Sequence, residues 1–371
     1  MNFELVLVVC VVGLSHSQGQ MPTFTCTIPS LCNGGGNIID PRILSPSTSA
    51  AIGAGGFPSG NGGFPSGNGG STGVVTPNVG IVSPTSCPSG YISCTSVICG
   101  TPSVLPGPNS GFATENAFPW QAFLRNNNNL GQKNGYAGGG VLLDQFHVLT
   151  AAHKISNLSS ISVSMGIYNT GNTNNVQTSQ VAQVWIHSNY NQTYLKNDVA
   201  ILRLATPMYM NNRVMPICLP QSGRNYIGSS SASCVVSGWG QTNFNTDNAP
   251  TQTLKQARVP IVANNQCTNS YTNILGAANT AAYLDFPNEI CAGGESQLDA
   301  CTQDGGSPLV CTDSGTQYSL VGLVLWGKNC GQPGRYGVYL NVPAYIGWIQ
   351  CTIQCLQGMQ TCSSCPAQRY L

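Results

Sequence analysis

The sequence predicts an all-β fold with a helix close to its carboxyl end. Residues 141–148 and 319–326 are rich in residue types that favour strands, and Asn- and Gly-rich turns join such stretches. Residues 342–354 instead place Ile346, Ile349 and Ile353 at helical spacing. We therefore expect strands through most of the large carboxy-terminal region and a packed helix at its end.

The amino-terminal end has the composition of a cleavable signal peptide. Residues 1–17 contain an apolar centre followed by Ser15 and Ser17, and this centre is shorter than the roughly 20 residues that span a bilayer. The chain carries 17 cysteines, which is unusual for a reducing cytosol, and removing the signal with Cys10 leaves an even number. We expect a secreted, extracellular protein, and Asn157 and Asn191 begin candidate glycosylation tripeptides.

Composition argues against several classes of partner. Only 7% of residues are charged and the net formal charge is +1, which makes binding to nucleic acid or to an acidic membrane improbable. No Asp or Glu lies between His153 and Asp198, so a carboxylate-lined calcium loop is not expected there. The four histidines show no zinc-ligand spacing. We expect no metal and no organic cofactor.

Three motifs follow one another in the chain order His, Asp and nucleophile. The segment TAAH ends at His153, NDVAIL contains Asp198, and QDGGSP occupies residues 303–308. With FPWQ at residues 118–121 and SGWG at residues 237–240, they resemble the motifs of trypsin-like (S1) serine proteases across residues 107–350. The resemblance implies a double six-stranded β-barrel with a C-terminal helix.

The nucleophile position of that family holds Gly305, because QDGGSP stands where the family carries GDSGGP. Acyl transfer needs a hydroxyl within reach of the histidine and beside oxyanion donors, and glycine offers none. Ser307 lies two residues too late, since Asp304 and Pro308 align without a shift. Gln303 occupies the first oxyanion position, where glycine is usual. The resemblance therefore implies a protein that is not an enzyme.

Other motif residues have two interpretations each. Asp299 stands where trypsin-like members carry the acid that selects Lys or Arg, and Trp326 and Gly327 stand in the segment that binds substrate as an extra strand. Asp299 could equally be held by loop hydrogen bonds with no ligand. His153 and Asp198 are retained remnants of the catalytic machinery, and we favour their interpretation as packed, hydrogen-bonded structure.

The resemblance also implies a set of disulfides, which fold geometry restricts to half-cystines that can meet. The implied pairs are Cys99–Cys218, Cys234–Cys311, Cys267–Cys291 and Cys301–Cys330. The family's usual bridge beside the catalytic histidine is missing at both ends, because Gly138 and Lys154 occupy its two positions. A homologue is expected to lose both halves together, since one half alone would leave an unpaired thiol.

The amino-terminal segments resemble an interrupted clip domain, the small disulfide knot that precedes many arthropod proteases. Residues 18–43 form its first part and residues 87–106 its second part with a linker, but they supply four clip cysteines instead of the usual six. Between them, residues 44–86 are a Gly/Pro/Ser-rich spacer with a tandem GGFPSGN repeat. The whole chain thus resembles clip-domain serine protease homologues of the prophenoloxidase-activating-factor and masquerade type.

The cysteine-rich tail at residues 351–371 is an addition to the family pattern. The tail is either a small additional element that binds another protein or, as we favour, a carboxyl end held in place by disulfides. Cys351 and Cys355 are a poor pair for each other on one helix face, so each is expected to reach forward to Cys362 or Cys365. A bond from the tail to the clip cysteines is the competing arrangement.

Zymogen activation of the usual kind is not expected. Residues 107–110 stand where active relatives begin with IVGG after cleavage, and no Lys or Arg occurs between Arg42 and Arg125. Trypsin-like processing before the barrel is therefore restricted to Arg42, inside the clip-like segment. A cut there cannot bring a new amino terminus to Asp304.

The sequence predicts a secreted, inactive serine protease homologue that acts as a protein-binding cofactor or scaffold in an extracellular cascade. The resemblance points to innate immunity, with prophenoloxidase activation or clotting as the process, and to prophenoloxidase or clip-domain proteases as partners. Two alternatives remain open: a residual trypsin-like endopeptidase, and a structural protein of a matrix or secretion, which the spacer and the scarcity of charge favour.

Overall fold

The computed structural model describes residues 99–129, 135–230, 233–241, 251–301, 303–312, 316–357 and Cys365, together with three short strands nearer the amino terminus. The chain divides into two compact units, one made of residues 1–38 and 70–97 and the other of residues 39–69 and 98–371. The proposed signal peptide, the spacer and Arg42 lie outside the described residues.

The first unit contains a three-stranded sheet. Strand β3 (Ile92–Ser96) lies between β1 (Phe24–Thr27), to which it is antiparallel, and β2 (Asn37–Ile38), to which it is parallel. Cys26 stands opposite Ser93 in this register. The two segments that resemble halves of a clip domain are therefore hydrogen-bonded to each other across the spacer that separates them in sequence.

The second unit begins with a closed six-stranded barrel in the order β10-β7-β6-β5-β8-β9. Its strands are β5 (Gln121–Asn126), β6 (Tyr136–Leu142), β7 (His147–Thr150), β8 (Ile161–Met165), β9 (Gln177–Ile186) and β10 (Ala200–Leu204). Aliphatic side chains such as Leu124, Leu142 and Leu202 form a buried core, as period-two strands permit. Residues 141–148 are not one strand, because the Asp144 carboxylate accepts backbone N–H bonds from Phe146 and His147 and closes a turn.

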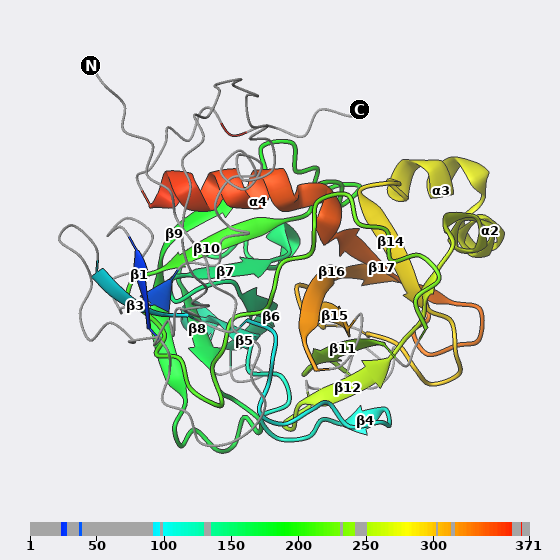
Figure 1. Cartoon of the computed structure of the whole chain (residues 1–371). Coiled ribbons are helices and arrows are strands. Elements are labelled where there is room, and N and C mark those ends of the chain that lie inside the picture. Colours follow the sequence, from blue (N-terminus) through cyan, green and yellow to red (C-terminus); the bar gives the residue numbers. More distant parts are fainter. Residues whose placement is uncertain are drawn as a thin grey trace, which may run out of the picture. The chain divides into compact units, whose positions relative to one another are not determined.

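The other half is an open sheet of eight strands in the order β13-β14-β17-β16-β15-β11-β12-β4. Its strands are β4 (Gly111–Phe112), β11 (Cys234–Gly238), β12 (Lys255–Arg258), β13 (Ile261–Val262), β14 (Glu289–Gly293), β15 (Pro308–Thr312), β16 (Tyr318–Gly327) and β17 (Tyr336–Asn341). The all-β class is confirmed, although this half is an open sheet and not a closed six-stranded barrel (Figure 1).

Helix α4 (Val342–Leu356) confirms the predicted carboxy-terminal helix and extends two residues beyond it. Its buried face includes Ile346, Ile349 and Ile353, and it packs against β10 of the barrel and β16 of the sheet. Helices α2 (Asn264–Leu275) and α3 (Ala277–Tyr283) were not predicted and lie beside the sheet (Figure 1). Only Cys267 and Tyr271 of α2 are buried, so its apolar periodicity is weak.

Five disulfides are seen among the described cysteines. They are Cys99–Cys218, Cys234–Cys311, Cys267–Cys291, Cys301–Cys330 and Cys351–Cys365. The first four are the pairs that the resemblance implies, and the fifth joins the helix end to the tail in the forward direction that we expected. Cys355 is also disulfide-bonded.

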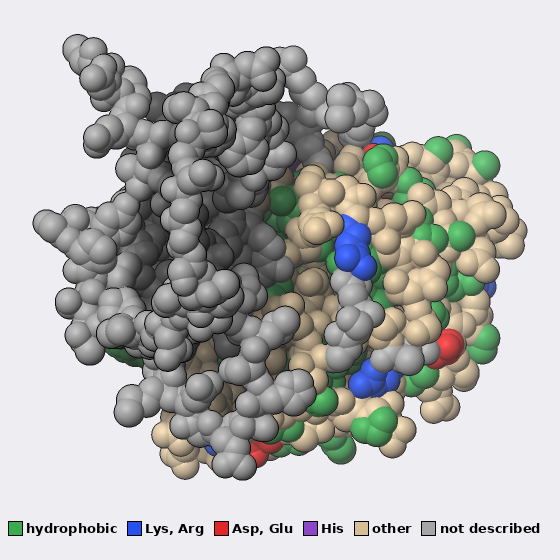
Figure 2. Space-filling view, in the orientation of Figure 1, with side chains coloured by type: hydrophobic (Ala, Val, Ile, Leu, Met, Phe, Trp, Pro, Cys, Tyr) green, Lys and Arg blue, Asp and Glu red, His purple; other side chains and the backbone are tan. Residues whose placement is uncertain are grey.

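Charged side chains are sparse on the surface that Figure 2 shows, where polar uncharged groups and backbone predominate. None of the helices among the described residues is long and apolar enough to cross a membrane.

Candidate active site

His153 and Asp198 form a close pair at the junction of the barrel and the sheet. His153 lies in a short 3-10 helix, η5 (Ala152–Lys154), directly after β7, and Asp198 precedes β10. The Nδ1 atom of His153 is 2.6 Å from Oδ2 of Asp198, and the His153 backbone N–H donates to Oδ1 at 2.8 Å. The Asp198 side chain is fully buried, whereas that of His153 is 23% exposed. Both carboxylate oxygens of Asp198 therefore have a partner, and the imidazole is fixed with its other edge turned toward Gly305.

The space beyond the imidazole is narrowed by two side chains. A Cβ atom added to Gly305 would lie 2.7 Å from Nε2 of His153 and 2.8 Å from Cδ of Lys154. Both distances are shorter than non-bonded carbon contacts, whose optimum is about 3.5–4.0 Å. The position that the resemblance assigns to the serine thus lacks a hydroxyl and is also crowded by two neighbouring side chains.

Lys154, at one of the two positions where the family's usual disulfide is missing, extends over Gly138 at the other. Its Cγ atom would be 3.1 Å from a Cβ atom on Gly138, so the aliphatic part of the lysine covers this glycine of β6. The neighbouring Gly139 donates its N–H to the Gly305 carbonyl at 3.1 Å and ties the turn to β6. Gly305 and the two positions where the resemblance expects a disulfide therefore lie close together, and the Lys154 side chain fills the space between Gly138 and Gly305.

Ser307 is enclosed in the interior. Its side chain is fully buried, and its Oγ atom would lie 3.0 Å from a Cβ atom on Gly238 of β11. Its backbone is fixed at both ends, because its N–H donates to the Asp304 carbonyl and its own carbonyl accepts from Val324. A hydroxyl at this place is enclosed between β6 and β11 and cannot meet a peptide substrate.

Gln303 adopts a backbone conformation that favours glycine. Its φ angle is 76°, in the left-handed region that an L side chain enters at a cost of about 1–2 kcal/mol. The resemblance expects glycine at this oxyanion position, so the substitution has kept the backbone direction and adds strain.

Asp304 is a buried carboxylate held only by backbone donors among the described residues. Gly240 donates its N–H to Oδ1 at 2.8 Å, and Cys301 donates to Oδ2 at 3.0 Å. Burial raises the pKa of Asp304 to about 6, although these two N–H groups act in the opposite direction. Asp304 also lines a cavity of about 430 Å³ with Asp299 and Lys255.

The chain segment aligned with the family's new amino terminus lies on β12. The Gln256 side-chain amide donates to the carbonyls of Gly107 at 2.9 Å and Asn109 at 2.6 Å, and Arg258 donates to Gly107 at 2.8 Å. Gly111 and Phe112 then pair with β12 as strand β4. The segment is therefore held along the sheet edge as continuous chain.

The predicted substrate-binding residues lie in the sheet half. Asp299 accepts the Gly331 N–H at 3.4 Å, and burial raises its pKa to about 7. Trp326 near the end of β16 stacks on Tyr271 and Tyr283, with ring centroids 4.9 and 5.9 Å apart. The arrangement fits both interpretations of Asp299, a pocket acid and a carboxylate held by its loop.

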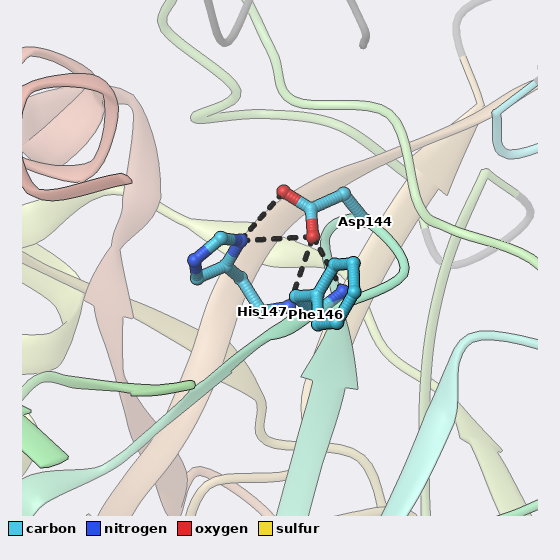
Figure 3. A network of polar contacts seen from close by, with 3 residues as sticks. All are labelled: Asp144, Phe146 and His147. Carbon is cyan, nitrogen blue, oxygen red and sulfur yellow. Dashed lines mark hydrogen bonds and ion pairs between the residues drawn. The ribbon is translucent and has the colours of Figure 1, made fainter. Parts of the chain in front are cut away.

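Two buried charge sites were not found by the motif analysis. Glu289 in β14 accepts the Asp285 N–H at 2.9 Å, and burial raises its pKa to about 8. Asp144 and His147 form a second His–Asp pair, in which Nδ1 lies 2.8 Å from Oδ2 (Figure 3). Glu289 could have been found as the single acidic residue of an otherwise apolar segment. Asp144 and His147 could have been found from their i, i+3 spacing.

The His147 pair resembles the His153 pair in its contacts and differs from it in exposure. His147 is 1% exposed, and its Nε2 atom has no hydrogen-bond partner among the described residues. Burial by itself would raise the pKa of Asp144, but the imidazole and the two backbone N–H donors bring it below its ordinary value. This pair has no route to a substrate and is a structural element of the barrel.

The exposure of the two candidate glycosylation residues is compatible with their predicted role. Asn157 and Asn191 are both exposed, as glycan acceptors must be. Within the described part of the chain, no group of three or more His, Cys, Asp or Glu side chains is placed to hold a metal ion.

Residues 109–349 match the family described as Trypsin. A protein of Aedes aegypti named inactive CLIP domain-containing serine protease A3 is 36% identical over 256 residues, which cover 66% of this chain and 51% of that protein. Phenoloxidase-activating factor 2 of Galleria mellonella is 34% identical over 256 residues, which cover 66% and 82% of the two chains. Mouse vitamin K-dependent protein C is 35% identical over 238 residues, covering 62% and 48%. The chain thus spans about half the length of the first and third of these relatives.

Proposed function

Because this chain belongs to the trypsin family, we propose that it is a secreted, proteolytically inactive serine protease homologue that binds other proteins in an extracellular protease cascade. The observation that carries the proposal is Gly305 itself, which brings no hydroxyl to the His153 ring at a place where an added Cβ atom would have to displace His153 or Lys154. Two of the relatives are named inactive CLIP domain-containing proteases.

Three properties of the site support the absence of catalysis. Gly305 supplies no hydroxyl to attack a carbonyl, and Ser307 is enclosed in the interior. Gln303 replaces the glycine expected at the oxyanion position. Asp304 is engaged by backbone donors, while the segment that would reach it in an active relative lies on β12. Restoring one of these features leaves the other two.

Protein partners are the natural ligands for such a scaffold. The relative named phenoloxidase-activating factor 2 supports prophenoloxidase activation as the process, with prophenoloxidase or a clip-domain protease as the partner. Processing at Arg42, inside the first clip-like segment, would be the switch. The many disulfides fit an oxidising, extracellular environment.

A residual endopeptidase is the competing candidate, and the well-formed His153–Asp198 pair favours it. The test is to treat the purified full chain with a fluorophosphonate probe and with arginyl and lysyl esters. We expect no labelling and no hydrolysis above background, with Ser307→Ala as the matched control. Turnover that disappears in Ser307→Ala would show that the buried hydroxyl reaches substrate and would overturn the proposal.

Gly305→Ser tests whether the missing hydroxyl is the only defect. We expect weak activity at best, since the new Cβ must displace the His153 ring or the Lys154 side chain and Gln303 remains. Robust hydrolysis by this single variant would show that the surrounding site is still competent. A pull-down from haemolymph with the intact protein, probed for phenoloxidase, separates a cascade cofactor from a structural protein of a matrix.

A further inference from the structure

A long connection without helices or strands leads from the barrel to the sheet half. The last strand of the barrel, β10, ends at Leu204, and β11 of the sheet begins at Cys234. In the part of residues 205–233 that the structure describes, there is no helix or strand. Structureless connections of this length are uncommon inside compact domains, where they are usually functional or linker segments.

The two parts of this connection differ in burial. Residues 216–220 are buried, whereas residues 221–225, with the sequence QSGRN, are all exposed. Tyr226 follows and is only 5% exposed, because it packs in the core of the sheet half. The exposed part is therefore a short surface loop between two buried anchors. Loop tips made of small and polar residues are preferred sites of proteolytic cutting.

Arg224 is the basic residue of this exposed loop. Among the Lys and Arg residues that the structure describes, only Arg224 and Lys328 are exposed, and the others are half-buried. Lys328 lies two residues before Cys330, whose disulfide to Cys301 restrains the turn. Arg224 thus combines exposure with an irregular backbone that has no disulfide beside it, which is what an endopeptidase that cuts after a basic residue requires.

The contacts around the Arg224–Asn225 peptide bond belong to the loop itself. The Arg224 N–H donates to the Gln221 carbonyl at 3.2 Å, and the Asn225 side chain accepts the Ile227 N–H at 2.8 Å. The Arg224 guanidinium lies 5.0 Å from the centroid of the Tyr226 ring. By itself, such an exposed cation–π contact slows capture of the arginine only about two- to fivefold. A protease can therefore draw out this loop without opening the core.

A cut at this bond would leave the two halves assembled. Of the five disulfides seen among the described cysteines, Cys99–Cys218 lies wholly before the bond and the other four lie wholly after it. Noncovalent contacts do cross it, because β4 before the bond pairs with β12 after it, and α4 after the bond packs against β10 before it. The cut protein would keep its fold as two chains.

We propose that the Arg224–Asn225 peptide bond is a processing site for an endopeptidase that cuts after arginine. Water adds across the bond, so that the Arg224 carbonyl carbon becomes a carboxylate and the Asn225 nitrogen becomes a free amino group. In the product, His153 lies on the first chain and Gly305 on the second. This inference goes beyond the proposed binding function and does not depend on it.

The experiment treats the folded full chain with a trace of trypsin and sequences the new amino termini. Among the described Lys and Arg residues, we expect Arg224 to be cut first, giving a terminus that reads Asn225, Tyr226 and Ile227. We expect the two fragments to elute together in size-exclusion chromatography under native conditions. A first cut at another described Lys or Arg, or separation of the fragments without denaturant, would overturn the inference.

Variants of the arginine test whether this loop sets the rate. Arg224→Gln should slow the first cut at least about tenfold, and Arg224→Lys should retain it, since trypsin also cuts after lysine. Arg335→Gln is the matched control, because Arg335 is half-buried on a turn where its N–H donates to the Gln332 carbonyl at 3.0 Å. Equal slowing by Arg224→Gln and Arg335→Gln would contradict the assignment.

Terminal-amine labelling of the protein from its natural source tests the processing itself. We expect part of the natural protein to carry an amino terminus at Asn225. Its complete absence would restrict the cut to the test tube and overturn the processing role.

Discussion

The two halves of the trypsin-like domain treat buried charge differently. In the barrel, Asp144 is paired with His147 and Asp198 with His153, each with additional backbone N–H donors. In the sheet half, burial raises the pKa of Glu289, Asp299 and Asp304 to about 8, 7 and 6. In the barrel, histidines and backbone N–H groups stabilise the buried carboxylates. In the sheet half, the surroundings of the buried acids stabilise their charged form poorly.

The two His–Asp pairs show that a short His–Asp contact does not by itself indicate catalysis. His147 and His153 both contact a carboxylate through Nδ1 at 2.6–2.9 Å. Only the second histidine is partly exposed, so the same geometry serves structure in one place and resembles catalysis in the other. Retention of His153 and Asp198 is therefore compatible with an inactive protein, in which the pair is kept because a buried acid needs a partner.

The largest loss of folding stability is expected from breaking the buried Asp144–His147 pair of the barrel. His147→Ala leaves the Asp144 carboxylate in the interior without its imidazole, and removing one partner of a buried pair costs about 3–5 kcal/mol. Urea unfolding followed by tryptophan fluorescence measures this cost. His153→Ala is the matched variant, and we expect a smaller loss because water can reach the vacated cleft. Equal losses at the two sites would mean that exposure does not distinguish them.

The second effect is a fall in stability as the pH rises. Glu289, Asp299 and Asp304 have folded-state pKa values above their ordinary values, so the folded protein binds more protons between about pH 4 and pH 8. The stability that protonation supports is present below pH 4 and is lost as the pH passes each folded pKa. We expect the melting temperature to fall between pH 5 and pH 8.

Glu289→Gln tests the origin of this slope. The amide retains an oxygen that can accept the Asp285 N–H and does not ionise, so the fall between pH 5 and pH 8 should become shallower. The exposed Glu295→Gln serves as control and should leave the slope unchanged. A wild-type melting temperature that rises toward pH 8 would contradict the prediction and indicate compensated acids in the sheet half as well.

The features that could be predicted from the sequence are those that depend on local motifs and on the spacing of cysteines and apolar residues. The His153–Asp198 pair and four disulfides follow local patterns shared with the family, and the helix at 342–356 has a clear apolar period. The crowding at Gly305 could not be predicted, because it depends on where the Lys154 side chain lies relative to two distant glycines. Helices α2 and α3 were missed because few of their residues are buried. The second His–Asp pair has a spacing that is common in turns.

A smaller effect is expected from relieving the strain at Gln303. Glycine there removes about 1–2 kcal/mol of left-handed strain, and its greater freedom in the unfolded chain returns about 0.5–1 kcal/mol. Gln303→Gly should therefore stabilise the protein by about 0.5–1 kcal/mol in urea unfolding, without restoring hydrolysis. Gln297→Gly is the matched control, since this exposed glutamine also has a positive φ of 62°. Destabilisation by Gln303→Gly alone would mean that its half-buried side chain contributes more than the strain costs.

The smallest effect is expected at the exposed ion pair of Arg213 and Glu115. The charged atoms are 3.2 Å apart, but the side chains are 34% and 48% exposed, so water and salt screen their attraction. Glu115→Gln should change the free energy of unfolding by no more than about 0.5 kcal/mol, and 0.5 M salt should remove even that difference. A loss of 2 kcal/mol or more would show that pairing itself, independent of burial, stabilises the barrel. The difference in how the barrel and the sheet half stabilise their acids would then reflect the number of ion pairs in each half. The burial of the acids would no longer explain it.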